Sequence, residues 1–574
     1  MELPTEEDNI RFFEQRFWVK SYRPGVPATI DNELAKWPSM IELFAADVKK
    51  YSKREGFVSI GTGVTYGEMY KYATRFAAWL QSRGVKKGDR VAIMMPNCLQ
   101  YPVALFGTLM AGAIVVNVNP LYTARELEHQ LKDSGAVAVV VLEMFGHTLE
   151  KALAGTQVQH IVVTALGDML GTFKGLAINM AMRHVEKLVP RYKLPRHTRW
   201  KSMMKRARRL VFKPVELKPE DLAFLQYTGG TTGVAKGAML SHRNVIANVL
   251  QGRALIEDQL LKMDTKSFTN VTLLPLYHIF SLTANLLMFT GVGGRNVLIA
   301  NPRDAKRVQL LLRKENFHGF CGINTLFAGF LENEQFRKRN FSNLKVVISG
   351  GMATHRDIAE RWEKVTGKPI IEGYGLTECS PVVCVGYIDL ERPGLMRYTG
   401  KVGLPVPSTE VRMRRSDGSW CGIGEPGELC VRGPQVMSGY WQRPEETAKV
   451  LNNDGWLATG DIGVMDATGQ VEIVDRIKDM ILVSGFNVYP AEIEEVISSH
   501  PKVLEVAAVG VPDPVNGERV KAVIVPRTND LTEQEIIAHC RKNLTGYKIP
   551  RIVEIRQEAL PKSAVGKLLR RELK

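Results

Sequence analysis

The sequence lacks the cysteine pattern of a disulfide framework or a structural zinc site. Its seven cysteines are an odd, scattered set that contains no C-x-x-C pair. The two closest, Cys379 and Cys384, have no histidine cluster beside them. Disulfide-rich secreted domains and zinc domains show regular cysteine spacings, so we expect buried free thiols in a reducing compartment.

Long hydrophobic runs and targeting segments are also absent. Apolar runs such as Ala136–Leu142 are far shorter than the roughly 18–20 residues of a membrane-spanning helix. The first residues, MELPTEEDNI, are acidic and polar, unlike a secretory signal. These absences predict a cytoplasmic protein that either stays in solution or rests on a membrane without crossing it.

What the sequence does contain is an ordinary globular composition with an excess of positive charge. Its 574 residues are too many for one core, and 45% hydrophobic with 24% charged residues excludes disorder, collagen and coiled coil. Lys and Arg outnumber Asp and Glu by 76 to 60, a net charge of +16. That charge predicts a polyanionic partner, either nucleic acid, an anionic membrane or phosphorylated substrates.

The order of strands and helices predicts the fold. Short apolar strands such as Arg90–Met95 alternate with helices, which is typical of parallel sheets covered on both faces. The chain becomes rich in turns after about residue 400 and changes again near Asp475. We predict a large N-terminal α/β domain over residues 1–475, with mostly parallel covered sheets and a β-rich subdomain. A small, mobile α+β domain would occupy residues 476–574.

A glycine-rich segment, Tyr227–Gly237 (YTGGTTGVAKG), predicts a phosphate cradle. Glycine lets backbone N–H groups approach an anion, while threonine hydroxyls and a lysine add donors. It is not a Walker A loop, because Lys236 precedes its glycine rather than following it. The alternative is a glycine-rich surface turn, which seldom concentrates three threonines and a lysine.

A second segment, Glu372–Glu378 (EGYGLTE), predicts a nucleotide contact directly after a strand expected over Lys368–Ile371. An exposed tyrosine between two glycines can present its face to a flat base. The threonine and glutamate that follow offer a hydroxyl to phosphate and a carboxylate to Mg²⁺. Taken alone, an ordinary turn at a strand end explains this segment equally well.

Three further residues indicate a nucleotide site only when they are considered together with the two segments above. Asp461, at the end of WLATGD, could accept hydrogen bonds from both ribose hydroxyls, and Arg476, in DRIKD, could support the same end of a nucleotide. Lys567 ends the tail segment PKSAVGK, where the preceding glycine favours a mobile, exposed turn. Separately, each is explained by a surface turn or a solvated charge.

Together these segments resemble, in order and approximate spacing, the acyl-adenylate-forming superfamily, which includes acyl-CoA synthetases, luciferases and peptide-synthetase adenylation domains. The resemblance runs from about Thr65 to Lys567. The segments NVNPLY (117–122), PLYHIF (275–280) and ILVSGFNVYPA (481–491) are similar to those of the long-chain acyl-CoA synthetases (fatty-acid–CoA ligases) of that superfamily.

The resemblance implies the residues that bind ATP and its metal. The β- and γ-phosphates would lie on the glycine-rich segment, at Thr228, Gly229, Gly230, Thr231, Thr232, Gly233 and Lys236. Adenine and ribose would contact Tyr374, Gly375, the Gly350–Gly351 turn, Asp461 and Arg476. Glu378 and Thr228 would hold Mg²⁺.

The resemblance also implies the catalytic residues: Lys567, Thr377, Glu378 and His278. Thr377 would touch the α-phosphate, Lys567 would neutralise charge at the reacting oxygens, and His278 would line the acyl site. Lys478 would be the hinge of the small domain, whose Ser484 and Gly485 would approach coenzyme A.

The implied activity is ATP-dependent activation of long-chain fatty acids to acyl-CoA through an acyl-adenylate, feeding β-oxidation or lipid synthesis. A fatty acid is already ionised at neutral pH, so the first step needs no general base. Its difficulty is to bring one anion onto another, so charge neutralisation and positioning should dominate. The cofactors implied are ATP, Mg²⁺ and coenzyme A.

Several alternatives stay open. A medium-chain, short-chain or aryl carboxylate–CoA ligase and an acyl-AMP-only ligase would carry the same adenylation motifs. A carrier-dependent adenylation domain is disfavoured because no carrier domain follows before Lys574. From another class, a basic membrane scaffold would leave the ATP motifs unexplained, and no nucleic-acid-binding motif is present.

Most of the positive charge lies in one segment. Arg183–Lys213 holds twelve Lys or Arg residues against one acid, Glu186, a charge of +11 in 31 residues. We expect it to contact anionic lipid, at about 1 kcal/mol per basic residue, and so to hold the protein at the cytoplasmic face of the inner membrane. The alternative is a solvated face that guides ATP and coenzyme A. Nucleic acid is the least favoured partner, and the sequence leaves a homodimer open.

Overall fold

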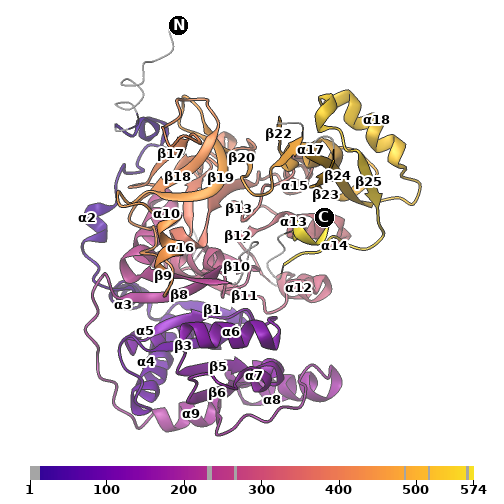
Figure 1. The fold of residues 1–574 in the computed structure, drawn as a ribbon. Helices are drawn as coiled ribbons and strands as arrows, with labels where there is room; N and C mark the ends of the chain where they lie inside the picture. The colour runs from indigo at the N-terminus through magenta and orange to yellow at the C-terminus, as the bar shows by residue number, and fades with distance from the viewer. Residues whose placement is uncertain are drawn as a thin grey trace.

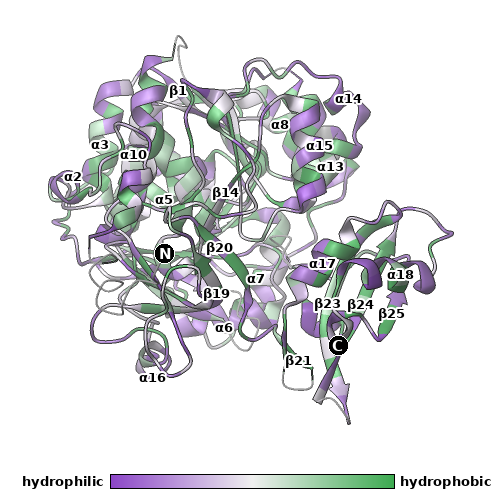
Figure 2. Cartoon of the chain, turned by 90° about the horizontal axis from the view of Figure 1, so that it is seen from above, coloured by the Kyte–Doolittle hydropathy of each residue, from purple (hydrophilic) through white to green (hydrophobic). Residues whose placement is uncertain are grey.

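The computed structural model describes residues 13, 15–228, 235–263, 268–313, 315–483, 486–514, 517–563 and 568–574. It contains the predicted large N-terminal α/β region and small C-terminal unit, so the predicted fold class is confirmed (Figure 1). Figure 2 shows the C-terminal unit, with α17 and α18, as a separate lobe beside the larger body. The proposed division at residue 475 falls one residue before the end of strand β20.

The first sheet has seven strands in the order β7-β6-β5-β3-β4-β8-β9, parallel except for β9 at one edge. Its central strands β3, β4 and β5 are almost entirely buried, as expected for a parallel sheet with covered faces. The strands are β3 (Arg90–Met94), β4 (Ile114–Asn117), β5 (Ala138–Leu142), β6 (His160–Thr164), β7 (Thr198–Arg199), β8 (Leu222–Thr228) and β9 (Lys236–Ser241).

The second sheet has nine strands in the order β16-β15-β14-β13-β12-β10-β11-β1-β2. The six strands from β14 to β1 are parallel, and β2, β15 and β16 are antiparallel edges. They are β1 (Glu55–Ser59), β2 (Thr62–Thr65), β10 (Thr269–Thr272), β11 (Arg295–Leu298), β12 (Gly319–Gly322), β13 (Val346–Gly350), β14 (Ile371–Gly375), β15 (Val382–Val385) and β16 (Leu404–Pro405).

Strand β14 corrects one sequence expectation. The strand predicted over Lys368–Ile371 begins only at Ile371 and continues through the EGYG segment to Gly375. Pro369 has no N–H to donate to a neighbouring strand, which explains why the preceding residues stay outside the sheet. The tyrosine of this segment therefore stands in a strand rather than in the turn after it.

Helices cover the sheets, and several begin at capping boxes that their sequences encode. Thr65, Thr123, Ser241 and Thr532 each accept a hydrogen bond from the third residue of their helix. Helix α5 is buried along its whole length and shares one core with α4 and α10.

The helices of the large region are α2 (Asp31–Leu34), α3 (Met40–Tyr51), α4 (Tyr66–Ser82), α5 (Gln100–Met110), α6 (Ala124–Ser134), α7 (Gly146–Ala152), α8 (Thr172–Met180), α9 (Trp200–Ala207), α10 (His242–Lys262), α11 (Ile279–Ser281), α12 (Ala305–Leu312), α13 (Asn324–Glu332), α14 (Glu334–Arg337), α15 (Arg356–Thr366) and α16 (Pro444–Ala448).

Two smaller sheets complete the chain. The turn-rich part forms the antiparallel sheet β17 (Glu410–Arg414), β18 (Gly427–Arg432), β19 (Leu457–Met465) and β20 (Val471–Arg476). The C-terminal unit contains β21 (Ile481–Val483), β22 (Phe486–Val488), α17 (Pro490–Ser498), β23 (Val503–Asp513), β24 (Gly517–Pro526), α18 (Glu533–Asn543) and β25 (Ile552–Ile555). Its apolar strand faces enclose a core of their own.

All seven cysteines are buried and free, which confirms the expectation drawn from their spacing. None of the helices in the described ranges is both long enough and apolar enough to pass through a bilayer.

Candidate active site

The predicted site residues gather where parallel strands end. Thr228 is the last residue of β8, Gly350 the last of β13, and Tyr374 and Gly375 the last two of β14. In open α/β sheets, the carboxyl ends of the strands form the edge where ligands bind. The motifs therefore fall on a binding edge supplied by two different sheets.

Of the predicted phosphate-binding residues in the glycine-rich segment, Thr228 and Lys236 are described, and they face each other across a strand pair. Thr228 on β8 is in register with Lys236 on β9. The Lys236 ammonium pairs with Glu446 of α16, and this contact, together with Lys449, lowers the Glu446 pKa to about 2. The intervening predicted phosphate-binding residues, Gly229, Gly230, Thr231, Thr232 and Gly233, lie outside the described residues.

Tyr440 connects the glycine-rich segment to the EGYGLTE segment. The ammonium of Lys236 lies 5.1 Å from the centre of the Tyr440 ring. The Tyr440 hydroxyl donates a 2.7 Å hydrogen bond to Glu378 Oε1. Burial and this carboxylate raise the Tyr440 pKa, so the tyrosine stays a donor. Sequence reasoning missed Tyr440, since nothing in SGYW distinguishes it from a turn.

The nucleotide-binding candidates from distant parts of the chain meet directly. The Tyr374 hydroxyl donates a 2.6 Å hydrogen bond to Asp461 Oδ2, and Arg476 Nε lies 3.3 Å from Asp461 Oδ1. Asp461 and Arg476 are cross-strand partners on β19 and β20. Burial and the Asp461 charge raise the Tyr374 pKa. Tyr374 is half-buried, where the sequence suggested an exposed ring.

Glycine is required at this edge because other groups approach closely. Gly351 has φ +81°, in the left-handed region, and a Cβ on Gly350 would lie 3.0 Å from the Phe280 ring. A Cβ on Gly375 would overlap the carbonyl oxygen of Pro381. Glycine therefore permits the close packing of the groups at these strand ends.

Glu372 is a second residue to which the sequence assigned no role. It is buried on β14, and its Oε1 accepts a 3.1 Å hydrogen bond from the Thr354 N–H, while its Oε2 has no recorded partner. Burial raises its pKa to about 7. It lines a cavity of about 420 Å³ that Arg397 and Lys401 also border. The sequence signal that could have identified Glu372 is an acidic residue in a strand, directly after the apolar Ile371.

His278 caps a helix beside this edge. Its Nδ1 accepts a 3.4 Å hydrogen bond from the Phe280 N–H at the start of α11. The preceding loop is held by Asn97, whose amide donates to the carbonyl oxygens of Thr272 and Leu274 at 3.0 and 2.9 Å. Asn97, buried just after β3, was another residue that sequence reasoning missed.

Three of the candidates in the C-terminal unit lie outside the described residues. Lys478 is exposed in the turn after β20, while Ser484, Gly485 and Lys567 lie outside the described residues. Before the residues outside the description, Lys562 forms an ion pair with Glu505 at 2.5 Å. After those residues, Arg570 is 2.7 Å from Glu494.

The residues suit Mg²⁺ carried by a nucleotide better than a metal held by protein alone. Within the described ranges, no group of three or more His, Cys, Asp or Glu residues could hold a metal ion. Glu378 offers one hard carboxylate and Thr228 one hydroxyl at the same edge. Mg²⁺ typically takes one or two carboxylates and completes its shell with phosphates and water.

The chain is similar to known proteins along nearly its whole length. Residues 44–441 match the AMP-binding enzyme family, and residues 492–567 match the AMP-binding enzyme C-terminal domain. A curated long-chain-fatty-acid–CoA ligase of Yersinia pestis is 52% identical over 98% of each chain. One of Bacillus subtilis is 36% identical over 97% of this chain and 98% of its own.

Solved structures share the fold. ATP-bound MatB from Rhodopseudomonas palustris, 26% identical, has a TM-score of 0.76 and covers 93% of this chain and 98% of its own. The anthranilate CoA ligase AuaEII in complex with anthranoyl-AMP has a TM-score of 0.80 over 94% and 98%, and at 24% identity it indicates the fold alone.

Glu372→Gln should change the pH dependence of stability. The raised pKa means that the folded protein binds this proton more tightly than the unfolded chain, so the ionised carboxylate costs stability above about pH 7. This loss of unfolding free energy begins as the pH rises above the unfolded value of 4.5, and it reaches its full extent near pH 7. Relative to wild type, the variant should gain about 2 kcal/mol of unfolding free energy between roughly pH 5 and pH 8, measured by urea denaturation without ligands.

The matched control is Glu363→Gln, an exposed carboxyl on α15. It should show no comparable gain across the same pH range. A constant difference between Glu372→Gln and wild type from acid to alkaline pH would contradict the assignment of a raised pKa to Glu372.

Proposed function

The chain belongs to the AMP-binding enzyme family, and from that membership we propose that it activates long-chain fatty acids to acyl-CoA. The enzyme is an ATP-dependent acid–thiol ligase that forms AMP and pyrophosphate through an acyl-adenylate. The observation that carries this function is the near-complete coverage and high identity of the chain with long-chain-fatty-acid–CoA ligases. ATP and coenzyme A are its co-substrates.

ATP would lie along the strand-end edge. Thr228 and Lys236 would contact the β- and γ-phosphates, and Lys236 would exchange its Glu446 partner for phosphate oxygen. Adenine would lie against Tyr374 and Gly375, beside the Gly350–Gly351 turn. Asp461 would accept hydrogen bonds from ribose hydroxyls, as it now accepts one from Tyr374, with Arg476 alongside.

Mg²⁺ would be held by Glu378 with Thr228 and the phosphates of ATP. The hydrogen bond from Tyr440 occupies one oxygen of the Glu378 carboxylate and orients the other. When bound, the ion would neutralise phosphate charge and so make the α-phosphorus easier to attack.

In the first half-reaction, a carboxylate oxygen of the fatty acid attacks the α-phosphorus, and the bond to the pyrophosphate oxygen breaks. Thr377 would donate to the α-phosphate. Lys567 would place a compact positive charge beside the reacting oxygens, where two anions must meet. His278 would line the acyl site next to Phe280 and Gly350, holding the loop through its helix cap.

In the second half-reaction, the sulfur of coenzyme A attacks the acyl carbon, the bond to the AMP oxygen breaks, and the thiol proton leaves to solvent. A lysine at the first-step position would obstruct this attack. Residues 476–574 would therefore rotate about Lys478, removing Lys567 and bringing Ser484 and Gly485 toward coenzyme A.

The recorded ion pairs between the two parts support such a motion. Arg527 lies 3.3 Å from Glu332, and Arg356 lies 3.8 Å from Glu495. At least one side chain of each pair is more than half exposed, so each pair is worth at most about 1 kcal/mol and separates at little cost.

The remaining partner is an anionic membrane at the cytoplasmic face, contacted by Arg183–Lys213. All twelve basic residues of this segment are exposed. A fatty acid partitions into lipid, so an enzyme at the surface meets its substrate where it is concentrated.

ATP–pyrophosphate exchange tests the function. We expect exchange that depends on palmitate, and acyl-CoA that forms only when coenzyme A is added. Preference for octanoate or benzoate over palmitate would instead favour a medium-chain or aryl ligase. Exchange without any thioester product would identify an acyl-AMP-only ligase, and no exchange with any fatty acid would overturn the enzyme assignment.

Lys567→Ala should separate the two half-reactions. Acyl-AMP formation from palmitate and ATP should fall by about a hundredfold or more, because the developing charge loses its partner. Thioester formation from supplied palmitoyl-AMP should persist. Lys562→Ala, in the same tail, is the control and should retain both. Equal loss of both half-reactions in Lys567→Ala would contradict the division of roles.

Reversing charge in the basic segment should weaken membrane binding. Arg208→Glu with Arg209→Glu should lower the affinity for vesicles containing phosphatidylglycerol by at least about tenfold at low salt. The control, Lys49→Glu with Lys53→Glu, changes the same charge on another surface. Equal binding by both variants would rule out a specific role for the segment.

A further inference from the structure

The outward face of helix α8 is apolar. Phe173, Leu176 and Met180 recur at helical spacing and leave 89%, 57% and 54% of their surface exposed. The π-helical turn η4 (Ala181–Val185) continues the helix and exposes 78% of Val185. A surface helix normally turns its apolar side to the core and its polar side to water. The amphipathicity of α8 is inverted.

The inward face of α8 is small and polar. Gly175 is buried, and a Cβ there would overlap the carbonyl oxygen of Gly167 in the 3₁₀ turn η3 (Leu166–Met169). Buried Asn179 accepts a 2.7 Å hydrogen bond from the Gly167 N–H and donates to Asp168 at 3.4 Å. These close contacts fix the rotation of the helix, so Phe173, Leu176 and Met180 face outward, while Ile178 alone packs partly against the core.

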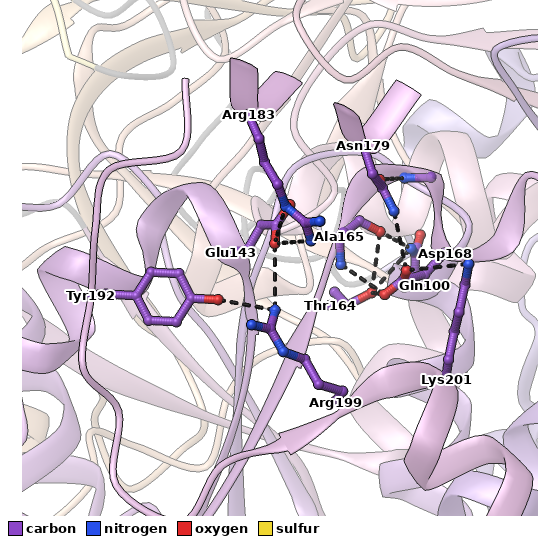
Figure 3. A network of polar contacts seen from close by, with 11 residues as sticks. Gln100, Glu143, Thr164, Ala165, Asp168, Asn179, Arg183, Tyr192, Arg199 and Lys201 are labelled. Carbon is purple, nitrogen blue, oxygen red and sulfur yellow. Dashed lines mark hydrogen bonds and ion pairs between the residues drawn. The ribbon is translucent and has the colours of Figure 1, made fainter. Parts of the chain in front are cut away.

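Two acidic side chains that are buried or nearly buried form ion pairs with basic residues that follow this helix. Glu143 lies 2.6 Å from Arg183 and 3.5 Å from Arg199. Asp168 lies 3.8 Å from Lys201. Figure 3 shows Glu143 between Arg183 and Arg199, with Asp168 facing Lys201. Glu143 holds the two ends of the segment between α8 and α9 together.

The other basic residues of the segment are available to a partner. In the described part of the chain, nine exposed side chains form no ion pair with an acid: Lys187, Arg191, Lys193, Arg196, Lys205, Arg206, Arg208, Arg209 and Lys213. In Figure 1, α8 and α9 lie along the lower edge of the molecule, away from the C-terminal unit. A partner there would leave that unit free to move.

We propose that the apolar face of α8 and η4 inserts into the interfacial layer of a bilayer containing anionic phospholipid, while Arg183–Lys213 contacts its headgroups. The 14 residues from Thr172 to Val185 extend about 21 Å, a length that lies in the interface rather than crossing it. The inference deepens the proposed function and rests on it, since the fatty acid substrate dissolves in the same layer.

Charge and apolar contact make separable contributions to this binding. Attraction between basic residues and headgroups is screened by salt, whereas burial of apolar side chains is not. The basic segment would bring the protein to the surface, and α8 would hold it there at high ionic strength. A protein partner recognised by its acidic surface would show the opposite pattern, because its binding would be lost in salt.

Vesicle sedimentation at two salt concentrations tests the insertion. Wild type should stay bound to phosphatidylglycerol vesicles at about 0.5 M salt, and Phe173→Ser with Leu176→Ser should lower that binding at least tenfold. Leu261→Ser with Leu310→Ser, at exposed leucines elsewhere, is the matched control and should bind as wild type does. Palmitate-dependent exchange without vesicles should be unchanged in both, which separates loss of docking from loss of the proposed activity.

A fluorescent probe at the helix gives a readout that does not depend on affinity. All seven native cysteines are buried, so a cysteine placed by Phe173→Cys can be labelled selectively with an environment-sensitive dye. Its emission should shift to the blue with vesicles and be quenched by quenchers in the lipid chains. The dye at Leu310→Cys should show neither change.

Each alternative outcome overturns the proposal. Salt-resistant binding that survives in Phe173→Ser with Leu176→Ser places the contact elsewhere. A blue shift that grows with protein concentration without vesicles identifies α8 as an interface between copies of this chain. No shift with vesicles means that the helix stays in water.

Discussion

The hydrogen bond that Tyr374 donates to Asp461 joins two sheets that are far apart in the sequence. Tyr374 ends strand β14 of the nine-stranded sheet, and Asp461 lies in β19 of the antiparallel sheet. Arg476 completes the contact from β20. Without this bond the Tyr374 hydroxyl would lose this partner and the buried Asp461 carboxylate would keep the ion pair with Arg476, at a cost of about 1–3 kcal/mol. The edge at which we propose that ATP binds depends on this contact.

A second contact of the same kind brings the phosphate-binding segment to that edge. Tyr440 lies between Lys236 and Glu378, so one aromatic side chain contacts both the cation proposed to bind phosphate and the carboxylate proposed to bind Mg²⁺. The reaction asks one anion to attack another, and its catalyst must mainly supply fixed charge and geometry. A site assembled from strand ends provides both, because its groups are held by sheets rather than by loops alone.

Features that depend on residues close together in the chain could be predicted from the sequence. Short apolar strands that alternate with helices identified the parallel sheets, and the change in texture near Asp475 identified the C-terminal unit. Tyr440 and Asn97 could not be foreseen, because their roles arise from contacts between segments far apart in the chain. The inverted face of α8 was also hidden, since a period of apolar residues does not tell which side meets the core. Its direction is set by Gly175 against Gly167.

The central claim is that the fatty acid carboxylate becomes joined to AMP before it reaches coenzyme A, and an isotope experiment tests it most directly. Palmitate carrying oxygen-18 in its carboxyl group should be converted with unlabelled ATP and coenzyme A, and the products analysed by mass spectrometry. Attack on the α-phosphorus predicts one labelled oxygen in AMP and one in the thioester. Unlabelled AMP, or label in pyrophosphate or inorganic phosphate, would contradict the acyl-adenylate.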